Sequence, residues 1–152
     1  RLGFVGRITN VDVTPVLDVL EKGYIPVVST IGCDNEGNVY NINADTAASF
    51  IAGAMNATRL ISMTDIAGVL KDKDDPNSII KCINIEDAQK LFQSGGISGG
   101  RMPRVECCIY AIRKGVEKVI IMDGRIPHSI LIELLTDEGA GTMVTEHYDE
   151  DR

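Results

Sequence analysis

Short apolar runs alternate along this chain with longer segments in which apolar residues recur every three to four positions. The runs at 25–29, 60–63 and 118–122 predict buried strands. The longer segments predict helices, since the apolar positions then share one face. These helices are expected at 44–55, 85–92, 105–114 and 128–135. The helix at 44–55 is expected to bury a face made of Ala47, Ala48, Ile51, Ala54 and Met55.

One further helix carries its own start and stop residues. Thr14 precedes Pro15, and Gly23 follows the last apolar position of the segment. Thr is a frequent N-cap, Pro is tolerated in the first turn, and Gly ends helices, so we expect Thr14 to cap a helix that ends before Gly23. The turn-forming run 34–37 then leads into a second extended segment at 39–42.

This order of elements predicts an α/β fold. Apolar strands that alternate with helices are typical of a three-layer αβα sandwich around a mainly parallel sheet covered on both faces. A chain of 152 residues is long enough for one domain with a core, and no repeat or linker divides it. Ligands in such folds collect at the carboxyl ends of the strands.

Composition excludes several classes of protein. The net charge of −7 argues against sequence-independent binding to nucleic acid or to anionic membranes. No apolar run approaches the ~18 residues of a membrane span, and no signal-peptide pattern opens the chain. The four cysteines show no CxxC spacing and are expected to be reduced, buried thiols. With two histidines and no cluster of ligand residues, no metal held by protein side chains is expected.

Three polar segments could carry chemistry. In the first, Asn41, Asn43 and Asp45 mark the junction of an extended segment and a helix. The amides suit a carboxylate or amide on a small ligand, and Asp45 in the first helical turn could orient a cationic group used in phosphoryl transfer. An Asn- and Asp-rich helix cap is the alternative.

In the second segment, 64–70, polar residues follow an apolar strand, as a nucleotide site requires, although such turns are also common without a ligand.

The third segment is the glycine-rich run 95–100, which precedes a helix. Glycines at a helix start expose backbone N–H groups to a phosphate, and Arg101 and Arg104 would add guanidinium groups. The run is neither a P-loop nor a GxGxxG dinucleotide motif, and a flexible loop is the alternative.

Several segments occur in an order that resembles one enzyme family. They are Tyr24–Val28, Tyr40–Thr46, Thr64–Leu70, Gly99-Gly100, Asp123–Ser129 and Thr136–Met143. From about Leu2 to Val144 the chain resembles the C-terminal half of the acetylglutamate kinases, within the amino acid kinase family. The resemblance implies a nucleotide-binding lobe at 1–145, an acidic tail at 146–152, and phosphorylation of the γ-carboxylate of N-acetyl-L-glutamate by ATP in arginine biosynthesis. It further implies that Mg²⁺ arrives bound to the nucleotide.

The resemblance also implies roles for individual residues. Asn41 and Asn43, with Ala44 beside them, would bind the α-carboxylate and acetamido groups of the substrate. Asp45 and Arg104 would be the catalytic pair. The residues implied to border the nucleotide are Thr64, Asp65, Gly68, Leu70, Gly99 and Gly100.

Two departures from the family pattern matter. Arg104 stands where the family has a lysine, and the wider guanidinium could cost on the order of 10²-fold in rate if it is poorly aligned. The family's first strand and glycine-rich phosphate loop have no counterpart here, so we expect this chain to be part of a longer protein that is homo-oligomeric when complete.

The last segments suggest regulation by a small molecule. Arginine-inhibited members of the family resemble this chain around His128 and 136–143, which implies an arginine-effector site with His128, Glu138 and Gly141. The alternatives are a helix-start role for His128 and a structural turn before the last strand for 136–143.

Two other functions stay open. The Asn41 and Asn43 pair cannot exclude a substrate one methylene longer, such as acetylaminoadipate. Two features favour a catalytically impaired nucleotide-binding or regulatory module: Arg104, and the lack of a counterpart here to the family's amino-terminal half. A cytoplasmic protein is expected, or a plastid protein if the source is a photosynthetic eukaryote.

Overall fold

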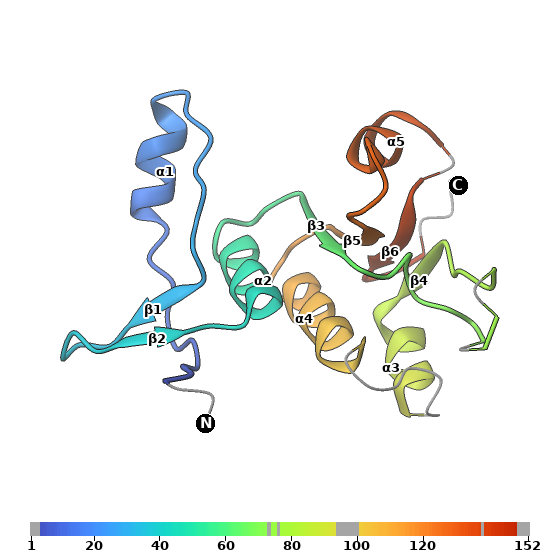
Figure 1. Cartoon of the computed structure of the whole chain (residues 1–152), viewed down its shortest axis with the longest axis horizontal. Coiled ribbons are helices and arrows are strands. Elements are labelled where there is room, and N and C mark those ends of the chain that lie inside the picture. The colour runs from blue at the N-terminus through green and yellow to red at the C-terminus, as the bar shows by residue number, and fades with distance from the viewer. Residues whose placement is uncertain (1–3, 73, 76, 94–100, 138, 149–152) are drawn as a thin grey trace.

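The computed structural model describes residues 4–72, 74–75, 77–93, 101–137 and 139–148 (Figure 1). Helices and strands alternate along most of this length, as the hydrophobic pattern predicts. In chain order they are α1 (Thr14–Glu21), β1 (Ile31–Cys33), β2 (Val39–Asn41), α2 (Ala44–Ala54), β3 (Arg59–Thr64), β4 (Cys82–Asn84), α3 (Ile85–Gln93), α4 (Arg101–Arg113), β5 (Lys118–Asp123), α5 (Ser129–Leu135) and β6 (Gly141–Thr145). None of the described helices has the length and apolar character needed to span a bilayer.

The main sheet has four strands in the order β3-β5-β6-β4. β3 runs parallel to β5 and β4 runs parallel to β6, whereas β5 and β6 are antiparallel. The α/β class with a mostly parallel sheet is therefore confirmed. The register places Leu60 opposite Val119, Val119 opposite Val144, and Val144 opposite Ile83. Directly opposed residues share one face of a sheet, so these four form an apolar row.

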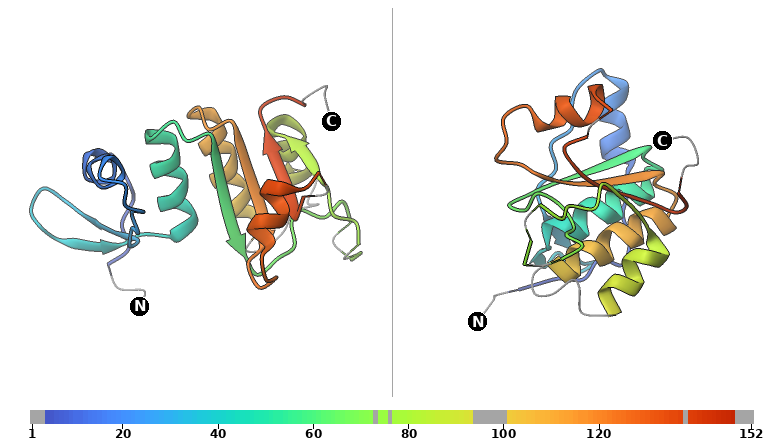
Figure 2. Two further views of the ribbon diagram at one scale, coloured as in Figure 1. Left: turned by 90° about the horizontal axis from the view of Figure 1, so that it is seen from above. Right: turned by 90° about the vertical axis from the view of Figure 1, so that its right-hand side faces the viewer.

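The core lies between this row and three helices. α2, α3 and α4 cover one face of the sheet (Figure 2). Val119, Val144 and Ile83 pack there with side chains of α4, and Leu60 is partly buried against the same cluster. Full burial of a Val or Ile side chain stabilises the fold by about 1.5–3 kcal/mol. Hydrophobic burial on this face therefore fixes the positions of α2 and α4, which carry the candidate site.

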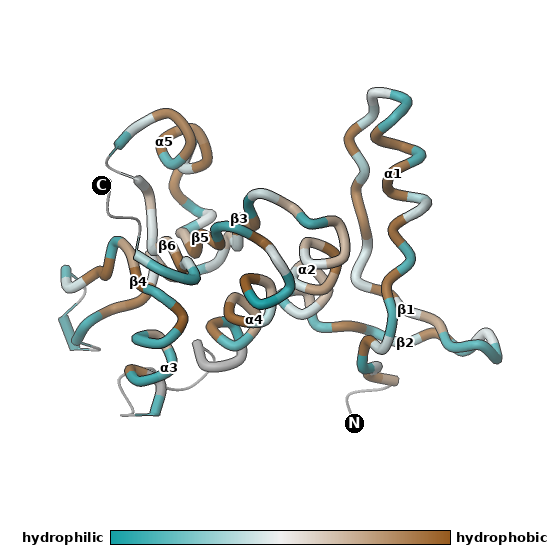
Figure 3. The backbone as a smooth tube through the Cα atoms, turned by 180° about the vertical axis from the view of Figure 1, so that it is seen from behind, coloured by the Kyte–Doolittle hydropathy of each residue, from teal (hydrophilic) through white to brown (hydrophobic). Residues whose placement is uncertain are grey.

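The opposite face of the sheet is covered by α5 (Figures 1 and 2). The arrangement has three layers, but the second helical layer is thin. Figure 3 colours much of α5 as hydrophobic, and Leu131 and Leu135 on this helix are exposed. Because α5 has only seven residues, it covers part of this face of the sheet while some of its own apolar side chains stay exposed to solvent.

The segment 25–29 corrects one prediction. It is not a strand, and Ile25 and Val27 are 89% and 94% exposed. A strand needs a neighbour that supplies backbone hydrogen bonds, and no described segment pairs with 25–29. The strands β1 and β2 instead pair with each other as a hairpin. Together with α1, this hairpin lies beyond α2, away from the main sheet (Figure 1).

Two helix details also differ from prediction. Thr14 is the first residue of α1 and not its N-cap, which is Val13 and makes no side-chain capping bond; the backbone N–H of Thr14 donates to Asp12 Oδ1 at 3.0 Å. The buried residues of α2 are Ala47, Ser49, Ala52 and Gly53, whereas Ala48 and Ala54 are exposed. α2 packs through small residues because it lies close to α4: a Cβ on Gly53 would come within 2.7 Å of Lys114 Cβ.

Candidate functional site

Asp45 and Arg104 form an ion pair between the first turns of α2 and α4. The Nε of Arg104 donates to Asp45 Oδ2 at 3.2 Å. Their side chains are 29% and 20% exposed, so the pair is partly shielded from water. α4 begins at Arg101, earlier than the sequence pattern predicts, and this extra turn places Arg104 on the helix. Two residues that the sequence separates by 59 positions therefore meet at one point.

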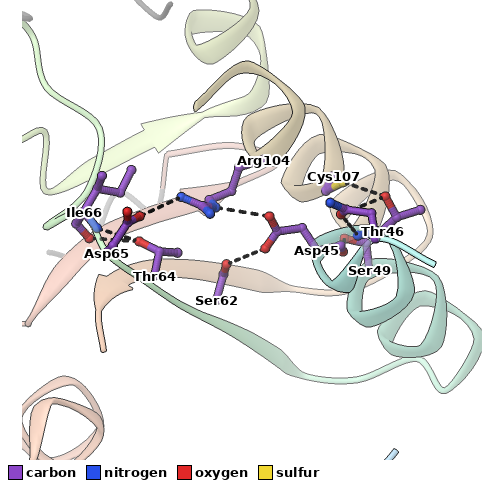
Figure 4. A network of polar contacts seen from close by, with 10 residues as sticks. Asp45, Thr46, Ser49, Ser62, Thr64, Asp65, Ile66, Arg104 and Cys107 are labelled. Atoms are coloured by element: carbon purple, nitrogen blue, oxygen red, sulfur yellow. Dashed lines mark hydrogen bonds and ion pairs between the residues drawn. The ribbon is translucent and has the colours of Figure 1, made fainter. Parts of the chain in front are cut away.

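Two residues of β3 and its following turn complete this contact (Figure 4). Ser62 Oγ donates to Asp45 Oδ1 at 3.4 Å, and Arg104 Nη1 lies 3.9 Å from Asp65 Oδ1. Asp65 is 79% exposed, so its attraction to Arg104 is weakened by water. Ser62 is not among the residues predicted from the sequence, although a polar side chain inside an apolar strand was a usable indication. The result is a charge network at the carboxyl end of β3.

The amide residues lie directly before this network. Asn43 is the N-cap of α2, and its Oδ1 accepts a hydrogen bond from Thr46 N at 3.0 Å. The capping role considered as an alternative is therefore present, and it leaves the Asn43 Nδ2 without a partner among the described residues. Asn41 ends β2 with an exposed side chain, and Ala44 opens the helix with an exposed side chain.

The segment 64–70 turns away from the end of β3. Thr64 Oγ1 both donates to Ile66 O and accepts from Ile66 N, each at 3.0 Å, so this hydroxyl closes the turn. Gly68 is buried with φ +152°, and a Cβ there would lie 2.5 Å from Thr142 Oγ1. Packing against β6 therefore explains the glycine without a ligand. Leu70 follows as a half-buried residue that bridges to Ile79.

Thr142 anchors this segment to the sheet. Its Oγ1 accepts a hydrogen bond from Val69 N at 2.8 Å and donates to Ile80 O at 2.7 Å. Thr142 is completely buried, so both backbone groups would lack a partner without the hydroxyl. The turn beside the candidate site is thus held by the last strand of the chain.

Arg125 and Asp123 form a second pair at the same edge of the sheet. Arg125 Nη2 donates to Asp123 Oδ2 at 2.7 Å, and Nε donates to Oδ1 at 2.9 Å. The Arg125 side-chain and backbone hydrogen bonds lower the pKa of Asp123 to about 2. Asp123 is paired in register with Thr64, which places this pair next to the end of β3. The Arg125 side chain is 70% exposed and was not among the predicted site residues.

Of the residues implied for an arginine effector, the structure describes His128 at the start of α5 and Gly141 at the start of β6. His128 is the N-cap of α5 with φ +62° and makes no side-chain capping bond. Gly141 begins β6, where a Cβ would run into the carbonyl oxygen of Ile121, so close strand packing explains this glycine. A polar pocket of about 410 Å³ lies at the other end of α5, where it is lined by Arg59, Glu133 and Asp137 but not by His128 or Gly141. Glu138 lies outside the described residues, as do Gly99 and Gly100 of the glycine-rich run.

The cysteines are free thiols with different exposure. Cys33 is exposed, which contradicts the expectation that all four are buried; it lies in the hairpin β1–β2, away from the core. Cys107 Sγ lies 3.7 Å from Thr46 Oγ1, beside the α2 cap. Burial raises the pKa of Cys108 to about 12, which keeps this thiol protonated. No group of three or more His, Cys, Asp or Glu side chains converges in the described part of the chain.

Comparison with known proteins gives a consistent result. The family model described as the amino acid kinase family matches residues 1–123. An acetylglutamate kinase from Brachyspira hyodysenteriae is 57% identical over 93% of this chain and 49% of its own length. A chloroplastic acetylglutamate kinase from Arabidopsis thaliana is 46% identical over 95% of this chain and 42% of its own length. This chain thus spans about half the length of the curated relatives that it matches.

A solved structure supports the fold independently. The crystal structure of N-acetylglutamate synthase from Neisseria gonorrhoeae, complexed with coenzyme A and N-acetyl-glutamate, superimposes with a TM-score of 0.87. The match covers 96% of this chain and 33% of that one at 23% identity, so the similarity concerns the fold alone.

Proposed function

This chain belongs to the amino acid kinase family, and we propose that the complete protein containing it is an acetylglutamate kinase. The reaction is the phosphorylation of the γ-carboxylate of N-acetyl-L-glutamate by ATP, in arginine biosynthesis. Relatives with this name at 46–57% identity support the proposal. The observation that carries it is the ion pair between Asp45 and Arg104 at the carboxyl end of β3.

The chemistry requires positioning and charge stabilisation more than a reactive side chain. An oxygen of the substrate γ-carboxylate attacks the γ-phosphorus of ATP. The bond between that phosphorus and the bridging oxygen breaks, and ADP leaves as the acyl phosphate forms. Arg104 stabilises the negative charge on the transferring phosphoryl group, and Asp45 orients the guanidinium. No side chain of this chain needs to form a covalent bond.

Substrate and nucleotide bind on the two sides of this pair. Asn41 and the Nδ2 of Asn43 donate to the α-carboxylate and acetamido groups, with Ala44 beside them. The nucleotide lies along Thr64, Asp65 and the following turn, and Arg125 adds a second guanidinium at the same edge. Both arginines suit phosphate oxygens, because a guanidinium presents several N–H donors in one plane. Mg²⁺, where the reaction uses it, is held by the phosphates of ATP and neutralises part of their charge.

Acceptor length and regulation are further parts of the proposed function. A longer acceptor such as acetylaminoadipate remains compatible with Asn41 and Asn43. The complete protein is also proposed to bind arginine as an effector near His128, Glu138 and Gly141, and to be a homo-oligomer. The chloroplastic relative makes the plastid a proposed location beside the cytoplasm.

A second candidate function is an impaired nucleotide-binding or regulatory module. The observation that favours it is Arg104 at the position where the family resemblance calls for lysine. The contact of Arg104 with Asp45 weighs against impairment, since the guanidinium reaches the carboxylate that has to orient it.

The direct test uses the complete protein with ATP, Mg²⁺ and either N-acetylglutamate or N-acetylaminoadipate. Release of ADP and capture of the acyl phosphate as a hydroxamate with hydroxylamine measure transfer. Transfer to N-acetylglutamate alone supports the narrow assignment, and equal transfer to both acceptors contradicts it. If neither acceptor reacts but MgADP at about 100 times its dissociation constant stabilises the protein by about 2.7 kcal/mol, the module is supported instead.

A further inference from the structure

Ser62 is a polar exception in an apolar part of the sheet. Leu60, two residues earlier on β3, points to the same face and packs against the core. Ile121, directly opposite Ser62 on β5, is 1% exposed. A half-buried hydroxyl in such a place needs a hydrogen-bond partner, because burying it unpaired costs free energy. The partner of Ser62 is the carboxylate of Asp45.

The two oxygens of that carboxylate have separate donors. Ser62 Oγ donates to Oδ1 at 3.4 Å from β3, and Arg104 Nε donates to Oδ2 at 3.2 Å from α4 (Figure 4). The last torsion of an aspartate side chain is soft, so a single donor would leave the plane of the carboxylate poorly defined. Two donors from two different elements define that plane.

We propose that Ser62 is a positioning residue for phosphoryl transfer: it holds the Asp45 carboxylate in the orientation that aligns the guanidinium of Arg104. This inference rests on the function proposed above. Ser62 acts through Asp45 and does not itself contact the reacting atoms. Its place on a strand suits the role, because the register with β5 fixes the Ser62 side chain against the core more firmly than a loop could.

The size of the effect follows from the geometry. A distance of 3.4 Å is long for a hydroxyl–carboxylate hydrogen bond, so the alignment that it adds is moderate. Loss of the hydroxyl is expected to lower kcat about three- to tenfold, well below the roughly 10²-fold loss expected for a misplaced catalytic group.

The test compares S62A, S62T and S129A in the complete protein. S62A removes the hydroxyl, whereas S62T keeps it. Ser129 is the matched control, since its buried hydroxyl has no hydrogen-bond partner among the described residues and therefore no hydrogen bond to Asp45 or Arg104. We expect S62A to lower kcat about three- to tenfold while KM for ATP and for the acceptor changes less than twofold. S62T is expected to keep at least half of the wild-type kcat, and S129A to match the wild type.

Three outcomes would overturn the proposal. Equal kcat for S62A and the wild type would show that the hydroxyl is not needed. A loss in S62T as large as in S62A would show that packing, not the hydrogen bond, matters. Equal losses in S62A and S129A would indicate a general effect of core substitution.

A second measurement separates this proposal from the kinase assignment. The unfolding midpoints of S62A, D45A and the double variant form a cycle that needs no activity, and each single change removes the hydrogen bond. Non-additive shifts support the contact between Ser62 and Asp45, and additive shifts contradict it. A wild-type protein that phosphorylates neither acceptor overturns the kinase assignment, and with it the positioning role, even if the cycle shows coupling.

Discussion

The guanidinium of Arg104 lies between two carboxylates, with Nε 3.2 Å from Asp45 Oδ2 and Nη1 3.9 Å from Asp65 Oδ1. Asp45 belongs to the start of α2, and Asp65 follows the end of β3. A planar fork can reach both groups, whereas an ammonium is a single point of charge. This geometry gives a physical reason why arginine can serve at this position.

The first prediction concerns Arg104 itself. R104M removes the charge and is expected to lower kcat by at least about 10²-fold. R104K keeps the charge near Asp45 and is expected to stay within about tenfold of the wild type. Steady-state kinetics of both variants check this. A gain of more than tenfold in R104K would mean that Arg104 impairs the enzyme, and an R104M variant with near-normal kcat would remove Arg104 from the mechanism.

The second prediction concerns Asp45. D45N keeps the shape of the side chain but loses the charge that orients Arg104, so kcat is expected to fall on the order of 10²-fold with a smaller change in KM. D65N serves as a comparison for stability only. Asp65 is largely exposed, so the free energy of unfolding of D65N should change by less than about 1 kcal/mol. A D45N variant with full turnover would contradict the role of the pair.

The third prediction concerns the hydroxyl of Thr142. T142V keeps the shape but leaves Val69 N and Ile80 O without their partner, which should lower the free energy of unfolding by about 2–3 kcal/mol. T142S keeps the hydroxyl and should lose clearly less. Urea denaturation of both variants measures the difference. Equal stability of T142V and T142S would show that the two hydrogen bonds contribute little.

The fourth prediction is a pH dependence at Asp123. Its pKa is about 2 in the folded state and near 3.8 without its partners. A carboxylate with a lowered pKa stabilises the fold above the unfolded value, and this contribution is lost as the pH falls through the folded value. R125M should therefore be less stable than the wild type at pH 6, and the difference should shrink between pH 4 and pH 2. A difference that stays constant over this range would argue that Arg125 acts through packing alone.

The fifth prediction concerns Gly141. A Cβ there would run into the carbonyl of Ile121 and force β5 and β6 apart, so G141A should cost more than about 3 kcal/mol in free energy of unfolding. G23A is the control, since Gly23 has φ +77° but open space around it. Its cost should be only the 1–2 kcal/mol or so of a left-handed residue. Thermal and urea unfolding compare the two, and a cost for G141A no larger than that for G23A would contradict the steric role of Gly141.

The hydrophobic pattern located most elements because periodicity is a local property. The strands at 60–63 and 118–122 and the helices at 44–55 and 85–92 appear within a few residues of their expected places. The pattern failed at 25–29, where an apolar run has no partner strand among the described residues. It also missed β4, because three residues give too little pattern to detect.

The candidate site likewise combines residues that local sequence indicates with contacts that only the structure shows. Asn43, Asp45 and Thr64 could be selected from the sequence, because each lies where a strand or a helix begins or ends, and polar side chains there face solvent or a ligand. A local pattern contains no distances between segments, so it could not show that Arg104 reaches Asp45. Nor could it show that Gly68 and Gly141 are needed for close packing against β6 and β5.

The sequence by itself thus determined the class of fold, the order of the elements and the residue types at the edge of the sheet, since all three follow from local periodicity and chemistry. The tertiary structure decided which of these residues meet. Contacts such as Ser62 with Asp45 and Thr142 with Val69 depend on strand register and on how closely the helices pack, and neither is encoded in any short stretch of the chain.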